Sequence, residues 1–278
     1  MTLRAALKWC DEMIVFLHAC TDESSDIIHR IAVLYRDRVT IIGDSLNPMW
    51  DEMQHRQRML EMARQPEIGA THIAIIDADE IVVGTVLVPL PGPGQMLMLP
   101  GYNLRGGIHQ YHANGIWGDR WFSMIFEDQP NLGWHGDGFH HRAPHGSESF
   151  AERKSLDRVG RSGVLHLWGA SEKRLMAKHA LYKVTERLKF PNKQAVLIEL
   201  EYNLWRSPED SKKRYPTVKQ FHDPWAFRPV PQNWWEDHLD VIKYLDVDRE
   251  PWQIAEVQRL VKEHGAEKFA GLDLFGIV

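Results

Sequence analysis

The sequence predicts an α/β protein in which helices flank a mostly parallel sheet. Over the first 83 residues, apolar strand-like runs alternate with helical segments, and this alternation is typical of parallel sheets with right-handed crossovers. In addition, one apolar run, residues 73–76, is followed directly by three carboxylates within four residues. A run that is apolar at every position suits a strand buried on both faces, and ligands of open α/β sheets lie beyond the ends of such strands.

The elements expected in the first part of the chain follow one another as helix, strand, helix, strand, helix and strand. Helical spacing of apolar residues marks the helices, and short apolar runs mark the strands. Asp22 or Ser24 is suited to cap the second helix. The expected helices are residues 3–12, 26–35 and 49–63, and the expected strands are residues 13–17, 39–42 and 73–76.

The rest of the chain has a different character, because glycine, proline, histidine and tryptophan crowd together after residue 87. Residues 87–102 suit an antiparallel strand at the edge of the first half. Gly265 is suited to a left-handed cap at the end of the last helix. The remaining expected elements are short strands at residues 121–126 and 163–168, helices at 171–188 and 252–264, and an irregular proline-rich segment at 212–235.

Composition argues against several classes of protein. The net charge of −5 and the pI of about 6.3 provide no field for non-specific binding to nucleic acid. Two cysteines, Cys10 and Cys20, make no framework for a secreted domain and are expected to be reduced. The N-terminus carries charges where a signal peptide would be apolar, and no apolar run approaches membrane-spanning length. A cytoplasmic protein without a transmembrane segment is therefore expected.

Asp77 and Asp79 are the leading candidates for chemistry. Burying a carboxylate without compensation costs many kcal/mol, so charges at the end of an apolar strand indicate a bound partner. Two carboxylates spaced by one residue on a bending chain can converge on one hard divalent cation, which often keeps phosphate oxygens as its other ligands. The pattern predicts a Mn2+ or Mg2+ site that carries a diphosphate.

With IIDADE in place, preceded by ALKWCDEMIVFLHACTDES and QHRQRMLEMA, the chain resembles bacterial glycosyltransferases of family 2, which have the GT-A fold. The segments FEDQPNLGWHGDGFHH and GVLHLWGASEKRLMAKHALYKVTE resemble the acceptor-side and closing segments of that family, so the resemblance covers most of residues 3–190. It implies a Rossmann-like, mostly parallel sheet with an antiparallel acceptor-side portion and a C-terminal helical extension. The expected parts are a nucleotide-sugar-binding half at residues 1–105, an acceptor half at 106–190 and an extension at 191–278.

The same resemblance implies roles for individual residues. Asp79 would bind the metal, Asp77 would contact the ribose or a metal-bound water, and Glu80 would lie beside the sugar. His166 would close the site as a third metal ligand or as a contact to the diphosphate. Basic side chains on two helices could neutralise the phosphates, and these are Arg56 or Arg58 on the earlier helix and Arg174 and Lys178 on the later one.

An inverting transfer needs a carboxylate within hydrogen-bond reach of the attacking hydroxyl. Asp137 is the first candidate for this base, because the glycines around it allow a close approach to a ligand, and Glu127 and Asp128 follow. The expected donor is a nucleotide-diphosphate sugar, with a UDP-sugar first. The acceptor stays open between a saccharide, a lipid head group, a protein and a modified nucleic-acid base, and the oligomeric state and the stereochemical outcome stay open too.

Two departures from the family pattern leave other functions open. In the family a strand precedes the first helix, whereas this sequence begins almost at that helix, and Leu17 and His18 stand where the family has an acidic residue. One alternative is a phosphatase of the haloacid dehalogenase type with Asp77 as its nucleophile. Another is a degenerate, non-catalytic transferase. A transition-metal site is a further alternative, and its histidine ligands would be His135, His140, His141 and His145.

Overall fold

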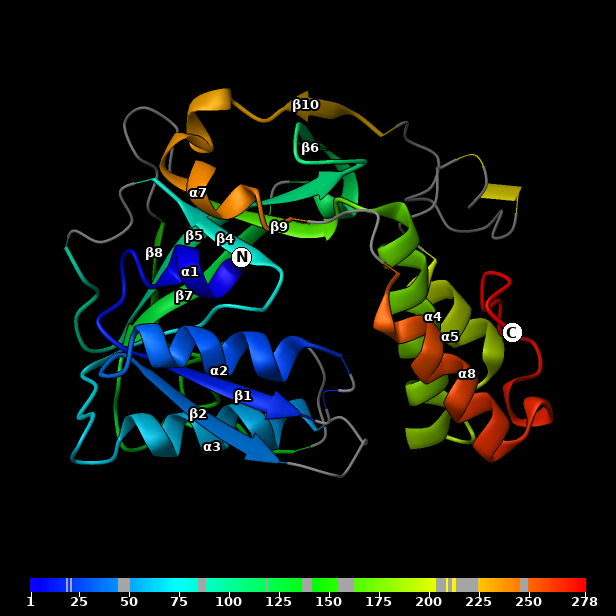
Figure 1. Ribbon diagram of the computed structural model, residues 1–278, viewed down its shortest axis with the longest axis horizontal. Coiled ribbons are helices and arrows are strands. Elements are labelled where there is room, and N and C mark those ends of the chain that lie inside the picture. Colours follow the sequence, from blue (N-terminus) through cyan, green and yellow to red (C-terminus); the bar gives the residue numbers. More distant parts are fainter. Residues whose placement is uncertain are drawn as a thin grey trace. The chain divides into compact units, whose positions relative to one another are not determined.

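The computed structural model describes residues 1–18, 20, 22–44, 51–84, 89–118, 120–136, 142–154, 163–203, 209, 212–213, 225–245 and 250–278. The protein is an α/β structure with mixed sheets and helices (Figure 1). It consists of two compact units. Unit 1 comprises Met1–Gly101, Trp121–Leu165 and Asn233–Tyr244, and unit 2 comprises Tyr102–Arg120, His166–Gln232 and Leu245–Val278. The predicted boundaries at residues 105 and 190 stay predictions.

Unit 1 begins with the alternating pattern that the sequence predicts. Strands β1 and β2 pair in parallel, from Met13 opposite Val39 to His18 opposite Asp44, as expected. In Figure 1 this pair lies between α2 and α3. The Asp22 side chain accepts from the Ser24 N–H at 2.9 Å at the start of α2, as the sequence suggests. The elements are α1 (Thr2–Ala6), β1 (Met13–His18), α2 (Ser24–Leu34), β2 (Val39–Asp44) and α3 (Glu52–Ala63).

The central strand differs from the prediction of a buried strand in a mostly parallel sheet, and that prediction is wrong. Strand β3 covers only His72–Ala74 and pairs antiparallel with β7 (Arg120–Glu127). Ile75 continues the contact, since its N–H donates to the Met124 carbonyl at 2.8 Å. The partner strand β7 lies about fifty residues later in the chain. Local periodicity indicates that a segment is a strand, but not which distant strand pairs with it or in which direction.

Further strands of unit 1 enclose the core around this strand pair. Strand β4 (Glu80–Val83) is buried at every position, and β5 (Gln95–Arg105) is buried from Met96 to Gly101. Strand β5 has β7 and β8 (Ala151–Lys154) as hydrogen-bonded neighbours, with β8 parallel to it, so it is not the edge strand that the sequence suggests. One core cluster of unit 1 consists of Met53, Leu60, Ile75, Met96, Met98, Phe126, Leu132 and Trp134.

Short elements complete unit 1. They are η4 (Glu236–His238), α7 (Leu239–Ile242) and most of η3 (Gln232–Trp234). Lys8 connects the chain after α1 to this segment, because its ammonium lies 2.7 Å from the Asp240 carboxylate. Part of the stretch expected to be irregular therefore forms short helical turns.

Unit 2 is organised around three helices, α4 (Glu172–Lys189), α5 (Ala195–Tyr202) and α8 (Trp252–His264), which lie side by side in Figure 1. The predicted helices at residues 171–188 and 252–264 are confirmed. Gly265 ends α8 with φ +85° and ψ 135°, a positive-φ conformation that favours glycine but differs from the left-handed cap that the sequence predicts. The helices enclose an apolar cluster with the turn η5 (Ala266–Phe269). The cluster consists of Ala180, Val184, Val257, Leu260, Val261 and Phe269.

The strands of unit 2 are short. Strand β6 (Gln110–His112) pairs antiparallel with β10 (Phe227–Pro229), and Tyr111 of β6 lies opposite Leu104 at the end of β5. The end of β9 (Gly163–Gly169) and the turn η1 (Gly115–Trp117) also belong here. The strand expected at residues 163–168 is confirmed.

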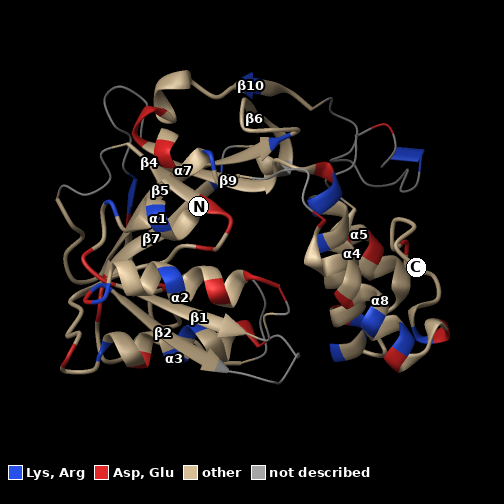
Figure 2. Cartoon of the chain, in the orientation of Figure 1, with Lys and Arg blue, Asp and Glu red and all other residues tan. Residues whose placement is uncertain are grey.

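Charges and apolar residues are mixed along the surface helices. Figure 2 shows acidic and basic positions interspersed on α8, where Arg259 lies 2.7 Å from Glu256. Within the described residues, no helix combines the length and the apolar character needed to cross a membrane.

Candidate functional site

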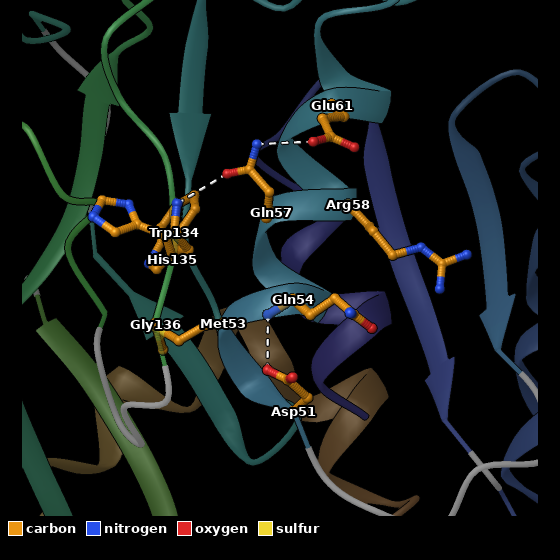
Figure 3. Close-up of a pocket in the computed structure, with 9 residues that line it drawn as sticks. All are labelled: Asp51, Met53, Gln54, Gln57, Arg58, Glu61, Trp134, His135 and Gly136. Carbon is orange, nitrogen blue, oxygen red and sulfur yellow. Dashed lines mark hydrogen bonds between the residues drawn. The ribbon is translucent and has the colours of Figure 1, made fainter.

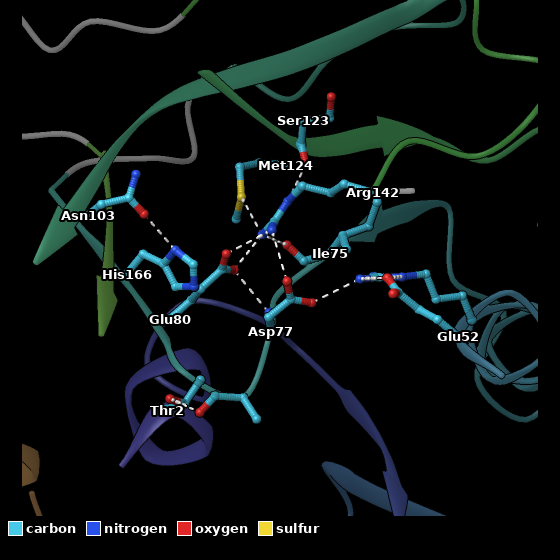
Figure 4. Close-up of polar contacts among 12 residues, drawn as sticks. Thr2, Glu52, Ile75, Asp77, Glu80, Asn103, Ser123, Met124, Arg142 and His166 are labelled. Atoms are coloured by element: carbon cyan, nitrogen blue, oxygen red, sulfur yellow. Dashed lines mark hydrogen bonds and ion pairs between the residues drawn. The ribbon is translucent and has the colours of Figure 1, made fainter. Parts of the chain in front are cut away.

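The carboxylate motif forms a closed turn between Ile76 and strand β4. The Glu80 N–H donates to the Asp77 carbonyl at 3.0 Å, and the Asp77 N–H donates to the Glu80 carboxylate at 2.9 Å. The Thr2 hydroxyl donates to the Ala78 carbonyl at 2.7 Å and attaches the first helix to the turn. Residues 77–80 are therefore fixed by both their main chain and their side chains (Figure 4).

Arg142 lies at the centre of this turn. Its guanidinium donates to both oxygens of Glu80, one of them at 2.8 Å, and approaches Asp77 Oδ2 at 3.4 Å. It also donates to the main-chain carbonyls of Ile75 at 3.1 Å and Ser123 at 2.9 Å. Figure 4 shows the guanidinium lying between the two carboxylates. One side chain thus joins the strand before the turn, the turn itself and β7.

A second arginine reaches the turn from helix α3. Arg56 forms an ion pair with Glu52 at 2.8 Å, one helical turn earlier, and another with Asp77 Oδ1 at 2.9 Å. Burial alone would lower the pKa of Arg56, but the nearby charges of Asp77 and Glu52 outweigh it and raise the pKa. Each oxygen of Asp77 therefore faces one permanently charged guanidinium.

The carboxylates of the turn differ in exposure. The Glu80 side chain is 1% exposed, whereas that of Asp77 remains 42% exposed despite its two arginine contacts, and Asp79 is half-buried. Three carboxylates, those of Glu52, Asp77 and Glu80, contact the guanidinium groups of Arg56 and Arg142. Glu80 has the contacts of a structural residue, and the solvent-facing negative charge belongs to the two aspartates.

This donor set fits a hard divalent cation that shares its ligands with a substrate. Within the described parts of the chain, no group of three or more His, Cys, Asp or Glu side chains is placed to hold a metal ion. Mg2+ and related ions are often held by one or two carboxylates and complete their coordination with phosphate oxygens and water. Asp77 and Asp79 fit that type of site.

The candidate bases have different surroundings. Asp137 lies outside the described residues. Glu127, the last residue of β7, is half-buried and lies opposite His72 in the strand register. Asp128 accepts hydrogen bonds from the fork of Arg64 at 2.7 Å on each oxygen, and this pairing raises the pKa of Arg64. A base at Asp128 would first have to separate from this arginine.

The later candidates all lie in unit 2. His166 on β9 is hydrogen-bonded through Nδ1 to Asn103 Oδ1 at 2.8 Å. Arg174 and Lys178 are half-buried and lie one turn apart on α4, and the Lys178 ammonium is 5.7 Å from the centre of the Tyr182 ring. Their predicted contacts with phosphate stay predictions.

Helix α3 also borders a depression of about 600 Å³ in unit 1 (Figure 3). Gln57 connects its two walls, because its side chain accepts from the Trp134 N–H at 2.9 Å, and it also donates to Glu61 of the same helix at 2.9 Å. Arg58 extends away from Trp134 in Figure 3, and its guanidinium lies 5.4 Å from the centre of the Phe16 ring. The depression is lined by Asp51, Met53, Gln54, Gln57, Arg58, Glu61, Trp134, His135 and Gly136.

Only two of the four histidines proposed as an alternative metal site can be compared. The rings of His135 and His145 are 3.9 Å apart between centroids with an interplanar angle of 34°. Their segments are joined by a pair of main-chain hydrogen bonds between Gly133 and His145. His140 and His141 lie outside the described residues.

Arg142 is the important residue that sequence reasoning missed. It stands in the histidine-rich stretch HHRAPH, 62 residues from Glu80, where no periodic pattern singles it out. The sequence does indicate that Glu80 needs a positively charged partner. Glu80 begins the apolar run EIVV, and a carboxylate buried there requires a cation. That argument calls for a partner without identifying which arginine supplies it.

No protein-family model, curated protein or solved structure matches the chain with significant similarity. The assignment of a function therefore rests on the residues and contacts described above.

Proposed function

We propose that this chain is a metal-dependent glycosyltransferase of the GT-A type, which moves a sugar from a nucleotide-diphosphate sugar to an acceptor hydroxyl. The observation that carries the proposal is the turn at residues 77–80, in which Asp77 stays 42% exposed although two arginines hold it. The arginines fix the orientation of this carboxylate, and its exposed part is where a cation can approach it. The order of elements before the turn, with the parallel pair β1 and β2 and the helix α3, supports a nucleotide-binding half.

Breaking the bond between the sugar and the diphosphate leaves negative charge on the departing phosphate. A divalent cation bound at Asp77 and Asp79 would supply the positive charge that stabilises this leaving group. The residues of the chain have the task of keeping the two aspartates in place. Arg56 and Arg142 fix the Asp77 carboxylate, and Glu80 closes the turn through the Asp77 N–H.

In this proposal the attacking hydroxyl loses its proton to a carboxylate at the end of β7 or in the segment that follows it. Asp137 stays the first candidate for that base, with Glu127 next. Asp128 is the least accessible of the three, since both of its oxygens accept from Arg64. The donor includes a nucleoside diphosphate, and a uridine base is expected first.

Asp79→Asn is the most direct test. The substitution removes one negative charge at nearly unchanged side-chain size and leaves Asp77, Glu80 and their arginine partners in the chain, so the protein should stay folded. Transfer or hydrolysis of UDP-sugars with Mn2+ should fall at least about 100-fold, the effect of losing one important electrostatic contact in a transition state. A nucleoside diphosphate with Mn2+ should also raise the melting temperature of the unsubstituted protein but not of the variant.

The matched control is Asp240→Asn, which removes an exposed carboxylate of the same unit. It should leave transfer unchanged. Full activity of Asp79→Asn would overturn the proposal. A covalent phosphoryl group found on Asp77 after incubation with phosphate monoesters would support a phosphatase instead.

A further inference from the structure

Unit 1 contains another cavity, of about 320 Å³, to which strands β5, β7 and β8 contribute side chains. All of the residues named as its lining belong to unit 1, so the cavity lies within one compact body. Its volume is at the lower end of the range for small-molecule sites and suits one small ligand. The lining residues are Met96, Met98, Ser123, Ala143, Pro144, His145, Ser147, Glu148, Phe150 and Glu152.

The floor of this cavity is apolar. Met96 and Met98 are two residues apart on β5, so their side chains lie on the same face of the strand, and both are buried. Phe150 packs against the core cluster that contains the two methionines. Thioether side chains are polarizable, adapt to ligands of different shape and make favourable contacts with aromatic rings. The floor therefore suits a ligand with an apolar body, and an aromatic ring in particular.

The rim of the cavity carries negative charge. Glu152 on β8 lies opposite Met96 in the parallel register, and Glu148 lies on the segment before β8. One oxygen of Glu148 accepts a main-chain N–H at 2.9 Å, which fixes this carboxylate at the rim. Among the described lining residues, none is a lysine or an arginine. Lys154 lies 3.9 Å from Glu152, but both side chains are exposed, and such a pair contributes little.

The segment 143–150, which forms one wall, is held by its own hydrogen bonds. Gly133 and His145 exchange two main-chain hydrogen bonds, at 3.2 and 2.7 Å. The Ser147 hydroxyl donates to the Pro144 carbonyl at 2.6 Å. A wall that is already in place lowers the cost of binding, because no chain has to be ordered when the ligand enters.

The cavity is distinct from the carboxylate turn, although both involve β7. The Ser123 side chain lines the cavity, whereas the Ser123 carbonyl accepts from Arg142 at 2.9 Å (Figure 4). The described lining residues do not include Asp77, Asp79 or Glu80. A ligand in this cavity would therefore occupy a different place from the cation and the donor of the proposed function.

We propose that this cavity is a binding site for a small organic cation, an ammonium group attached to an aromatic body. The aromatic body contacts Met96 and Met98, and the ammonium group faces the carboxylates of Glu148 and Glu152. The ring of Phe150 adds to the attraction, because the face of an aromatic ring attracts a cation. Phosphorylated ligands are disfavoured at the same rim, since like charges that face one another cost free energy.

The first test is isothermal titration with 2-phenylethylamine, which combines a primary ammonium group with a phenyl ring. We expect a Kd of about 1 mM or lower, in the range of a well-bound fragment of this size. The neutral analogue 2-phenylethanol should bind about 5-fold more weakly, because it lacks the charge. The difference between the two probes should shrink at high salt, which screens exposed charges. Equal affinities at low salt, or no binding of the amine at about 10 mM, overturn the proposal.

The second test uses the double variant Glu148→Gln with Glu152→Gln, which removes both charges at nearly constant size. Both positions are exposed, so the variant should fold, and it should bind the amine and the alcohol equally. The control Glu67→Gln removes an exposed carboxylate of the same unit outside the cavity and should keep the preference for the amine. An undiminished preference in the double variant overturns the proposal.

A third variant, Ala143→Phe, fills the cavity and should remove the binding of both probes. Undiminished binding would place the ligand elsewhere and overturn the proposal, and the double variant decides the question if Ala143→Phe does not fold. None of these measurements involves the transfer of a sugar. The cation site and the proposed function can therefore fail separately.

Discussion

Among the described residues, a network of buried charge in unit 1 and another in unit 2 are built differently. In unit 1, Asp77 and Glu80 of the turn and Glu52 of α3 contact Arg56 and Arg142, and Asp77 stays 42% exposed. In unit 2, Lys183 on α4 is 0% exposed and lies 2.9 Å from Glu199 on α5, whose side chain is 6% exposed.

The second network is completed by neutral groups. The Lys183 ammonium also donates to the Asn203 amide oxygen at 3.1 Å and to the Asp273 carbonyl at 2.8 Å, and the Asp273 N–H donates to Glu199 at 2.8 Å. It lies 4.2 Å from the centre of the Phe275 ring as well. Such a network joins α4, α5 and the C-terminal segment, and both charged side chains of its ion pair are buried.

The difference separates a structural network from a candidate site. A buried ion pair without exposure contributes to specificity of packing, and it is costly to break because the remaining charge has no water around it. A network that leaves an oriented carboxylate facing solvent can accept a further charged partner. Both networks contain buried charges, so burial does not separate a structural network from a candidate site. The exposed Asp77 carboxylate does separate them.

The largest expected loss of stability follows from breaking the buried Lys183–Glu199 network of unit 2. Lys183→Met leaves Glu199 buried without its cation, and we expect the free energy of unfolding to fall by about 3–5 kcal/mol. Urea unfolding measures this loss. The double variant Lys183→Met with Glu199→Gln should recover more than half of it, because no buried charge is then left. A loss below about 1 kcal/mol in the single variant would contradict the assignment of this network to stability.

A smaller loss of stability is expected from breaking the unit 1 network, in which Asp77 is partly exposed. Arg142→Met removes the main partner of Glu80, but water reaches the neighbouring Asp77, so we expect unfolding to be easier by about 2–4 kcal/mol. Arg142→Lys keeps the charge without the fork and should lose less. Adding Glu80→Gln to Arg142→Met should restore part of the stability. A cost above that of Lys183→Met would show that the two networks do not differ in the way proposed.

His112 is a buried polar group of a different kind from the two networks, because it has no charged partner within the described residues. His112 on β6 is 1% exposed, and in the described part of the chain neither ring nitrogen has a hydrogen-bond partner. It lies against Trp225 and Phe227, at 5.0 and 4.8 Å between ring centroids. Burial, with a smaller contribution from the charge of Arg105, lowers the pKa of His112 to about 4.

The sign of the pH effect follows from this shift. The unfolded chain protonates His112 near pH 6.5 and the folded protein only near pH 4, so its contribution to stability is complete above pH 6.5 and is lost as the pH falls towards 4. The loss is up to about 3 kcal/mol. Urea unfolding at pH 7, 5.5 and 4.5 measures it, and His112→Phe should show a smaller decrease over this range. Equal decreases in both proteins would contradict the assignment.

The sequence located the motif of the candidate site but not its environment. Asp77 and Asp79 were found because carboxylates at the end of an apolar run are unusual, and Arg56 because a basic helix precedes them. Arg142 could not be found, since its contacts with Glu80, Asp77 and β7 join segments that are far apart in the chain.

Local sequence determined the helices α4 and α8, the parallel pair β1 and β2, and the position of the carboxylate turn, because these depend on periodicity, caps and short-range alternation. Tertiary structure decided that β3 pairs antiparallel with β7, that Glu80 faces inward to Arg142, and that Asp77 keeps its exposure. The physical reason is that strand pairing and charge compensation depend on which distant segments meet. A single sequence specifies that a buried carboxylate needs a cation, and only the folded chain selects which one it meets.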